Sequence, residues 1–160
     1  MVLDKHKPLS AEAAKNAEDK SEEIESKPEG NKEPEKENKK GILIIDDEKS
    51  NIIALTHFLR EDYSVFVTRD SRDALEMVED HRPDIILLDI IMPEMDGYEV
   101  ISALKKSKKA NDIPVVFISG LVSPEAIKKG FSLGASDYIT KPFEAAAVKN
   151  TVKKLLDQKQ

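Results

Sequence analysis

From residue 41 onward the sequence alternates between short apolar runs and longer stretches with helical periodicity. This alternation restricts the fold more than any other feature of the chain. The apolar runs are too short for most helices and too apolar for surface strands, which is typical of buried parallel strands. Five such units in about 120 residues predict a doubly wound α/β fold, a parallel sheet with helices on both faces. The predicted strands are 41–45, 64–68, 84–89, 114–119 and 136–140.

Capping residues mark where several of the predicted helices begin and end. Asp96 followed by Glu99 resembles a capping box, and Ser123 before Pro124 is typical of a helix start. Gly134 can end the helix that Ser123 begins, in the left-handed conformation. Apolar side chains at helical spacing give each helix one buried face. These are Ile52, Leu55, Phe58 and Leu59; Ala74, Leu75 and Val78; Val100, Ile101 and Leu104; and Val148, Val152, Leu155 and Leu156.

The first 40 residues differ in composition from the rest. Residues 1–40 contain no Phe, Tyr or Trp, and most of them are Lys, Glu, Asn or Pro. Such a segment cannot bury enough apolar surface to offset an ordering entropy of about 1–2 kcal/mol per residue. We therefore expect a disordered, charged tail or linker over 1–40 and one folded domain over 41–158.

Charge and composition argue against several function classes. The net charge of −6 disfavours nucleic acid or an anionic membrane as the main partner. No apolar run approaches the ~20 residues of a membrane span, and the N-terminus does not have the pattern of a secretory signal. The absence of cysteine excludes disulfides, thiolate metal sites and cysteine nucleophiles. We expect a cytoplasmic protein without membrane insertion or direct nucleic-acid binding.

Polar side chains follow four of the five predicted strands, at the sheet edge where ligands bind in open folds of this class. Three carboxylates, a hydroxyl and an ammonium converge there, from Asp46, Asp47, Asp89, Ser119 and Lys141. Carboxylates held this close repel one another, and a hard divalent cation such as Mg²⁺ removes the conflict. A carboxylate nucleophile, a metal, an ammonium and a hydroxyl donor are the components that phosphoryl transfer uses.

Each of these residues also has an ordinary structural explanation. An acid after a strand is often a helix cap, a serine there is usually a turn residue, and a single lysine is usually solvated. An entirely structural explanation needs several independent coincidences, because the fold brings all five residues to one edge. The lysines at 105, 106, 108 and 109 are different, and we expect them to form a solvated surface.

Four motifs between residues 41 and 158 resemble the receiver domain of two-component response regulators. They are ILIIDDE (42–48), DIILLDIIMPEMDGYEV (84–100), PVVFISG (114–120) and GASDYITKPF (134–143). The resemblance implies a flavodoxin-like (βα)5 fold whose five parallel strands have the order 2-1-3-4-5. Residues 1–40 have no counterpart in it.

The resemblance also implies the chemistry of the site. Asp89 would accept a phosphoryl group from a histidine kinase or a histidine phosphotransfer protein, in a Mg²⁺-dependent step of a phosphorelay. The protein ligands of Mg²⁺ would be Asp46, Asp47, Asp89 and the backbone carbonyl of Ile91. Such a domain catalyses only its own phosphorylation and dephosphorylation, so we expect a signalling domain and not an enzyme with separate substrates.

The switch that follows phosphorylation is implied in the same way. Lys141 and Ser119 occupy the lysine and Ser/Thr positions of the family, and Tyr138 occupies its switch-aromatic position. Ser119 would move toward the phosphoryl group, and Tyr138 would turn inward, reshaping the face of the fourth helix, fifth strand and last helix. The peptide bond between Lys141 and Pro142 is typically cis in this family. No output domain fits after residue 156, so we expect this face to contact an unknown downstream protein or a second copy.

Two other functions stay open on the sequence alone. A Mg²⁺-dependent phosphatase of the haloacid-dehalogenase type also uses a carboxylate nucleophile, but its Asp-x-Asp pair follows the first strand. Here Asp46 and Asp47 are adjacent, and the nucleophile would follow the third strand. A receiver-like domain that no longer accepts phosphate usually lacks the acceptor, the lysine or one of the paired acids, and all of these are present. Turnover of a phosphomonoester would favour the first function, and no response to beryllofluoride the second.

Overall fold

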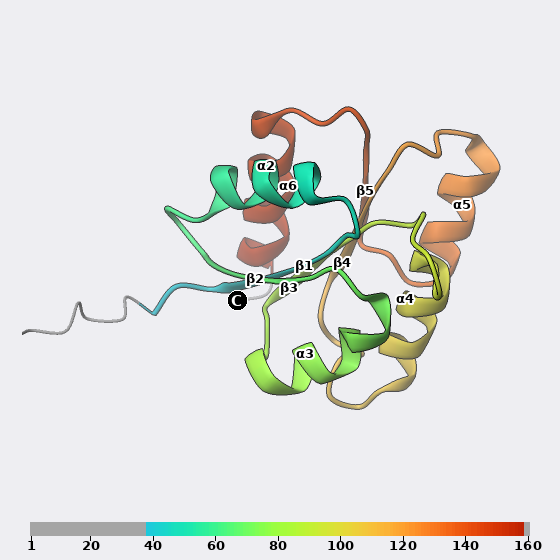
Figure 1. Ribbon diagram of the computed structural model, residues 1–160, viewed down its shortest axis with the longest axis horizontal. Coiled ribbons are helices and arrows are strands. Elements are labelled where there is room, and N and C mark those ends of the chain that lie inside the picture. The colour runs from blue at the N-terminus through green and yellow to red at the C-terminus, as the bar shows by residue number, and fades with distance from the viewer. Residues whose placement is uncertain (1–37, 159–160) are drawn as a thin grey trace, which may run out of the picture. The chain divides into compact units, whose positions relative to one another are not determined.

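The computed structural model describes residues 38–158, so nearly all of the expected tail over 1–40 lies outside the described residues. Strands and helices alternate along the described chain (Figure 1). The strands are β1 (Gly41–Ile45), β2 (Ser64–Thr68), β3 (Ile85–Leu88), β4 (Val115–Ser119) and β5 (Asp137–Thr140). The helices are α2 (Lys49–Leu59), the 3-10 turn η2 (Ser71–Asp73), α3 (Ala74–His81), α4 (Gly97–Lys106), α5 (Pro124–Ser132) and α6 (Ala145–Gln158).

The five strands form one parallel sheet in the order β2-β1-β3-β4-β5. The structure therefore confirms the predicted fold class and the strand order that the motifs implied. Every residue of β1, β3 and β4 is buried, because these inner strands are covered on both faces. Burial on both faces is why these three strands are continuous apolar runs in the sequence.

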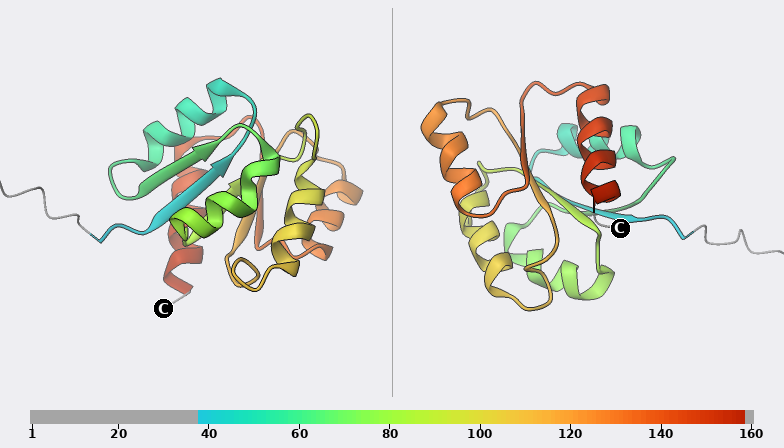
Figure 2. Two further views of the ribbon diagram at one scale, coloured as in Figure 1. Left: turned by 60° about the horizontal axis from the view of Figure 1, so that its bottom comes forward. Right: turned by 180° about the vertical axis from the view of Figure 1, so that it is seen from behind.

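Helices cover both faces of the sheet (Figure 1). The helices α2 and α6 pack on one face, and α3, α4 and α5 pack on the other, as two further views in Figure 2 show. Successive strand residues point to opposite faces, so β1 contributes to two separate cores. Leu43 and Ile45 join the core beneath α3 and α4, whereas Ile42 and Ile44 join the core beneath α2 and α6.

The predicted caps are confirmed. The Asp96 carboxylate accepts a hydrogen bond from the Glu99 backbone N–H at 2.9 Å, and the Glu99 carboxylate accepts one from the Asp96 N–H at 2.9 Å. Ser123 Oγ accepts from the Ala126 N–H at 3.2 Å. Gly134 follows α5 with a φ of 107°, the left-handed conformation that ends a helix.

Two expectations about the exposure of side chains were wrong. Leu75 was placed on the buried face of its helix with Ala74 and Val78, but it is 38% exposed, because adjacent residues of a helix do not share one face. Lys105 was placed on a solvated surface. Its ammonium instead donates to the carbonyls of Asn111 at 3.3 Å and Ile113 at 3.4 Å, and burial lowers the pKa of this lysine.

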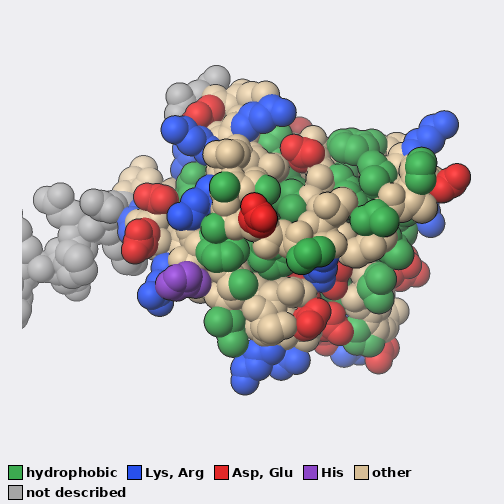
Figure 3. All heavy atoms as spheres, turned by 90° about the horizontal axis from the view of Figure 1, so that it is seen from above, with side chains coloured by type: hydrophobic (Ala, Val, Ile, Leu, Met, Phe, Trp, Pro, Cys, Tyr) green, Lys and Arg blue, Asp and Glu red, His purple; other side chains and the backbone are tan. Residues whose placement is uncertain are grey.

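The face that α2 and α6 cover carries a mixture of side-chain types. Figure 3 looks onto this face and shows acidic and basic side chains dispersed among hydrophobic ones. No single sign of charge dominates it. Within residues 38–158, none of the helices is long and apolar enough to cross a bilayer.

Candidate functional site

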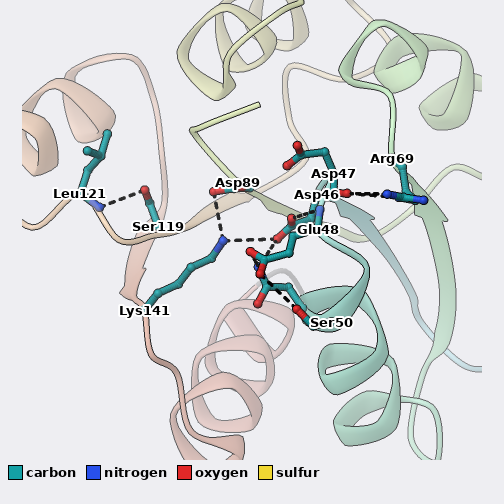
Figure 4. Close-up of polar contacts among 10 residues, drawn as sticks. Asp46, Asp47, Glu48, Ser50, Arg69, Asp89, Ser119, Leu121 and Lys141 are labelled. Carbon is teal, nitrogen blue, oxygen red and sulfur yellow. Dashed lines mark hydrogen bonds and ion pairs between the residues drawn. The ribbon is translucent and has the colours of Figure 1, made fainter. Parts of the chain in front are cut away.

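Three aspartate carboxylates meet at the carboxyl ends of β1 and β3. Asp46 and Asp47 directly follow β1, and Asp89 directly follows β3, with the last paired residues of the two strands in register. One oxygen from each of the three carboxylates lies within 4.8 Å of the others. Asp46 and Asp89 are only 2% and 5% exposed, and Asp47 is half-buried. The structure brings together the three acids that the sequence singled out (Figure 4).

Lys141 directly follows the edge strand β5 and reaches this cluster across the carboxyl end of β4. Its Nζ lies 3.3 Å from an oxygen of Asp89 and 3.5 Å from an oxygen of Asp46, so one ammonium bridges two carboxylates (Figure 4). The backbone of Lys141 is held by a hydrogen bond from its N–H to the Ser119 carbonyl at 2.9 Å. The Lys141–Pro142 peptide bond is cis, as the resemblance implied.

The two buried acids differ in how far they are already engaged. Asp46 Oδ1 accepts the backbone N–H of Glu48 at 2.8 Å, and Asp46 Oδ2 accepts from the side chain of Asn51 at 3.2 Å. Asp89 faces the same Lys141 ammonium as Asp46, and a hydrogen bond from the Ile90 backbone also favours its charged form. Asp46 is therefore held at both of its oxygens, by its own loop and by the first turn of α2, whereas Asp89 lines the open pocket.

Ser119 and Tyr138 lie beside the cluster and are linked to each other through one residue. Because β3 lies between β1 and β4, Asp89 lies between the β1 acids and the end of β4, where Ser119 is completely buried. Ser119 Oγ accepts the Leu121 N–H at 3.2 Å, and the Tyr138 hydroxyl donates to the Leu121 carbonyl at 2.5 Å. Both polar groups of the Leu121 backbone are therefore held by the two residues that the resemblance assigns to a switch.

A pocket of about 630 Å³ opens over two of the three acids, Asp47 and Asp89. The wall includes Ile91, whose side chain is 61% exposed, and the basic side chains of Lys49 and Arg69. The remaining lining residues are Asp47, Glu48, Asp89, Gly120 and Lys141. The pocket therefore gives a ligand access to the carboxylates of Asp47 and Asp89 and to the ammonium of Lys141 together.

Comparison with known proteins decides the family. The family model described as "Response regulator receiver domain" matches residues 42–153. The chain belongs to the response regulator receiver domain family.

Similar receiver domains occur in longer proteins and in solved structures. A "Probable cyclic di-GMP phosphodiesterase" of Vibrio cholerae is 40% identical over 119 residues, which are 74% of this chain and 27% of that protein. The "Alkaline phosphatase synthesis transcriptional regulatory protein PhoP" of Bacillus subtilis is 36% identical over 118 residues, 73% of this chain and 48% of that protein. This chain thus spans less than half the length of either relative. The receiver domain of a histidine kinase from Syntrophus aciditrophicus is 35% identical with a TM-score of 0.69, covering 74% of this chain and 91% of that one.

The electrostatics of this receiver domain suit a divalent cation. Burial raises the pKa of both Asp46 and Asp89, and the charge of Asp46 raises the pKa of Asp89 further, while Lys141 acts in the opposite direction on both. One ammonium does not neutralise three carboxylates. A hard cation with oxygen ligands would remove the remaining repulsion, and receiver domains generally bind Mg²⁺ at such an acidic pocket. The donor set of this receiver domain fits that ion.

The raised pKa of Asp89 predicts the pH dependence of stability in the metal-free receiver domain. Between the ordinary value of 3.8 and the raised value, the folded state binds more protons than the unfolded state. Ionised Asp89 therefore costs stability at neutral pH, and the cost disappears as the pH falls through the raised value toward 3.8. We expect Asp89→Asn to raise the free energy of unfolding in EDTA at neutral pH and to lose this advantage near pH 3.8.

Urea unfolding at the two pH values measures this effect. Asp73→Asn is the control, because Asp73 is exposed and makes no capping hydrogen bond with its side chain. A metal-free Asp89→Asn protein less stable than the wild type at neutral pH would contradict the prediction.

Sequence reasoning missed two residues of the site. Arg69 directly follows β2, the one strand whose end was not considered, so the same rule applied to all five strands would have found it. Gly97 begins α4 and lies against the backbone of Asp89 and Ile90, an approach for which the sequence signal was only a glycine after the Asp96 cap. The predicted role of the Ile91 carbonyl in metal binding stays a prediction.

Proposed function

We propose that residues 41–158 form a Mg²⁺-dependent phospho-accepting switch, in which Asp89 takes a phosphoryl group from a phosphohistidine on a histidine kinase or phosphotransfer protein. The observation that carries the proposal is the cluster of three carboxylates within 4.8 Å, with the Lys141 ammonium 3.3 Å from Asp89. Phosphoryl transfer depends on positioning and charge neutralisation more than on covalent chemistry by the protein. This cluster supplies both.

Access to the open pocket favours Asp89 over Asp46 as the nucleophile, because Asp89 lines the pocket and Asp46 does not. Both oxygens of Asp46 already accept hydrogen bonds, from the Glu48 backbone and from Asn51 of α2, which leaves this carboxylate oriented but occupied. Asp89 meets Lys141 and also lines the open pocket, so a phosphoryl donor can approach it. Asp46, Asp47, Asp89 and the Ile91 carbonyl would hold Mg²⁺, which when bound neutralises charge on the transferring group.

The linked contacts of Ser119 and Tyr138 support a route from Asp89 to the surface. A phosphoryl group on Asp89 would attract the Ser119 hydroxyl, which now accepts the Leu121 N–H. That change would alter the Leu121 backbone, whose carbonyl the Tyr138 hydroxyl already holds while the ring packs against the buried core. Phosphorylation would then favour this inward position of Tyr138 over an outward one. The outcome is a changed face of α5, β5 and α6, where Phe131 is 45% exposed.

This face would contact a downstream protein or a second copy of the chain. A nearly complete change from 1:99 to 99:1 between two states needs about 5.5 kcal/mol of preference from phosphorylation. The contacts of Ser119 and Tyr138 with Leu121 are the part of the described chain that would distinguish the two states.

Incubation with acetyl phosphate, a small acyl phosphate donor, tests the proposal. In Mg²⁺ the intact protein should gain the mass of one phosphoryl group, and EDTA should prevent the gain, because the repelling carboxylates lose their counterion. Electrospray mass spectrometry of the whole protein measures both conditions. Sustained hydrolysis of a phosphomonoester without a stoichiometric phosphoprotein would contradict the proposal and favour a phosphatase.

A further inference from the structure

The peptide unit between Asp47 and Glu48 is held at both of its polar ends. Its N–H, from Glu48, donates to Asp46 Oδ1 at 2.8 Å. Its carbonyl, from Asp47, accepts two hydrogen bonds from the guanidinium of Arg69, from Nε at 3.2 Å and from Nη2 at 2.9 Å (Figure 4). This one peptide unit therefore connects Arg69 to Asp47, whose carbonyl it contains, and to Asp46, whose carboxylate accepts its N–H.

The sheet explains why Arg69 reaches this peptide. The ladder between β1 and β2 continues one step beyond the strands, where the Asp46 N–H donates to the Thr68 carbonyl at 3.3 Å. Arg69 is the next residue, so its side chain extends over the end of β1 at the level of Asp47. Arg69 is exposed and lines the same pocket as Asp47 and Asp89. Two hydrogen bonds to a single carbonyl restrain this long side chain, whereas contact with water alone would leave it free to change conformation.

We propose that Arg69 is a positioning residue of the Mg²⁺ site: by holding the Asp47 carbonyl it keeps the carboxylates of Asp46 and Asp47 in place for the ion. The guanidinium polarises the peptide, and chains of hydrogen bonds strengthen one another, so the bond from the Glu48 N–H to Asp46 is strengthened too. This inference rests on the proposed function, because it assumes that these acids bind Mg²⁺.

Positioning and direct charge make opposite predictions for the loss of Arg69. A positive guanidinium beside a cation site repels the ion, so its charge alone predicts tighter Mg²⁺ binding once Arg69 is removed. Positioning predicts weaker binding. The guanidinium is exposed, and salt screens exposed charges over about 8–10 Å, whereas the geometric restraint does not depend on salt. We therefore expect positioning to dominate at physiological ionic strength, and the sign of the change distinguishes the two effects.

Calorimetric titration of the full chain with Mg²⁺ tests the proposal. Removing an outer partner of metal ligands typically weakens metal binding by about 10–100-fold, and we expect Arg69→Ala to fall near the lower end because its bonds reach a backbone carbonyl. Arg69→Lys keeps the charge and one donor group and should retain part of the affinity. Arg72→Ala is the matched control. Arg72 is also an exposed arginine, in the 3-10 turn η2 three residues after Arg69, but it pairs with Asp70 at 2.6 Å and does not line the pocket.

Hydrogen exchange of the Glu48 amide gives a readout that needs no metal. In EDTA this N–H should exchange several-fold faster in Arg69→Ala than in the wild type, and at the wild-type rate in Arg72→Ala. Arg69→Ala protein that binds Mg²⁺ as tightly as the wild type, or more tightly, would overturn the proposal. Wild-type protein that binds no Mg²⁺ at all would instead overturn the metal site of the proposed function, so the two failures can be told apart.

Discussion

An Asp89→Asn protein should take up no phosphoryl group from acetyl phosphate or from a phosphohistidine donor, with labelling reduced to background. The amide has nearly the shape of the carboxylate, so the β3 end and the pocket keep their form. It lacks the nucleophilic oxygen that forms the acyl phosphate, and it weakens the cluster's hold on Mg²⁺. Radiolabel incorporation and whole-protein mass, measured with Mg²⁺ over the same time course as the wild type, test this expectation.

Loss of labelling in a variant can also result from misfolding, and the stability prediction for Asp89→Asn separates the two causes. Because ionised Asp89 costs stability in the metal-free protein, Asp89→Asn should be folded at least as firmly as the wild type, and lost labelling then reports chemistry. Asp73→Asn changes an exposed aspartate in the same way and should label normally. Undiminished labelling of Asp89→Asn would place the acceptor elsewhere, and peptide mapping would then distinguish Asp46 from Asp47.

The sheet was predictable because of where its inner strands lie. Burial on both faces makes β1, β3 and β4 continuous apolar runs, which sequence periodicity detects directly. The predicted boundaries of β3 were one residue too wide at each end, at Asp84 and Asp89. Asp84 Oδ2 accepts the Gly41 N–H at 2.7 Å outside the strand, and Asp89 already faces the cluster. Polar residues at the two ends of a strand can lie outside its hydrogen-bonded ladder, and the neighbouring apolar run does not show where the ladder stops.

From residue types and strand ends alone, the site was predictable where charged side chains meet. Asp46, Asp47, Asp89 and Lys141 could be grouped because parallel strands end at one edge, and carboxylates and an ammonium have complementary charges. Arg69 binds the carbonyl of Asp47, a group that any residue at that position would present, so residue types carry no trace of the pairing. The same holds for Leu121, whose backbone joins Ser119 to Tyr138. Contacts to the backbone become visible only in the folded structure.

Gly97→Ala should lower the free energy of unfolding by about 2 kcal/mol, within the range for overpacking a tight contact. Gly97 begins α4, and its N–H donates to the Ile90 carbonyl at 2.8 Å. A Cβ at this position would lie 2.7 Å from the Ile90 Cα and 3.0 Å from the Asp89 carbonyl carbon, and it would also overlap the Asp89 carbonyl oxygen. Alanine favours helices over glycine by up to about 1 kcal/mol, but these obstacles are backbone atoms that cannot rotate away.

The steric clash in Gly97→Ala should also slow phosphorylation of Asp89, because the Asp89–Ile90 backbone has to move to remove the clash. A displacement of about 1 Å of a reacting group can cost about 100-fold in rate, so phosphorylation of Gly97→Ala should slow well beyond its loss of stability. Urea unfolding and the acetyl phosphate reaction measure the two effects. Gly120→Ala is the control for unfolding, since a Cβ there meets no atom within 4 Å, and its free energy of unfolding should stay within about 0.5 kcal/mol of the wild type. A Gly97→Ala protein as stable as Gly120→Ala would show that the start of α4 can move away from β3, and Asp89 would then be less tightly placed than the contact at Gly97 requires.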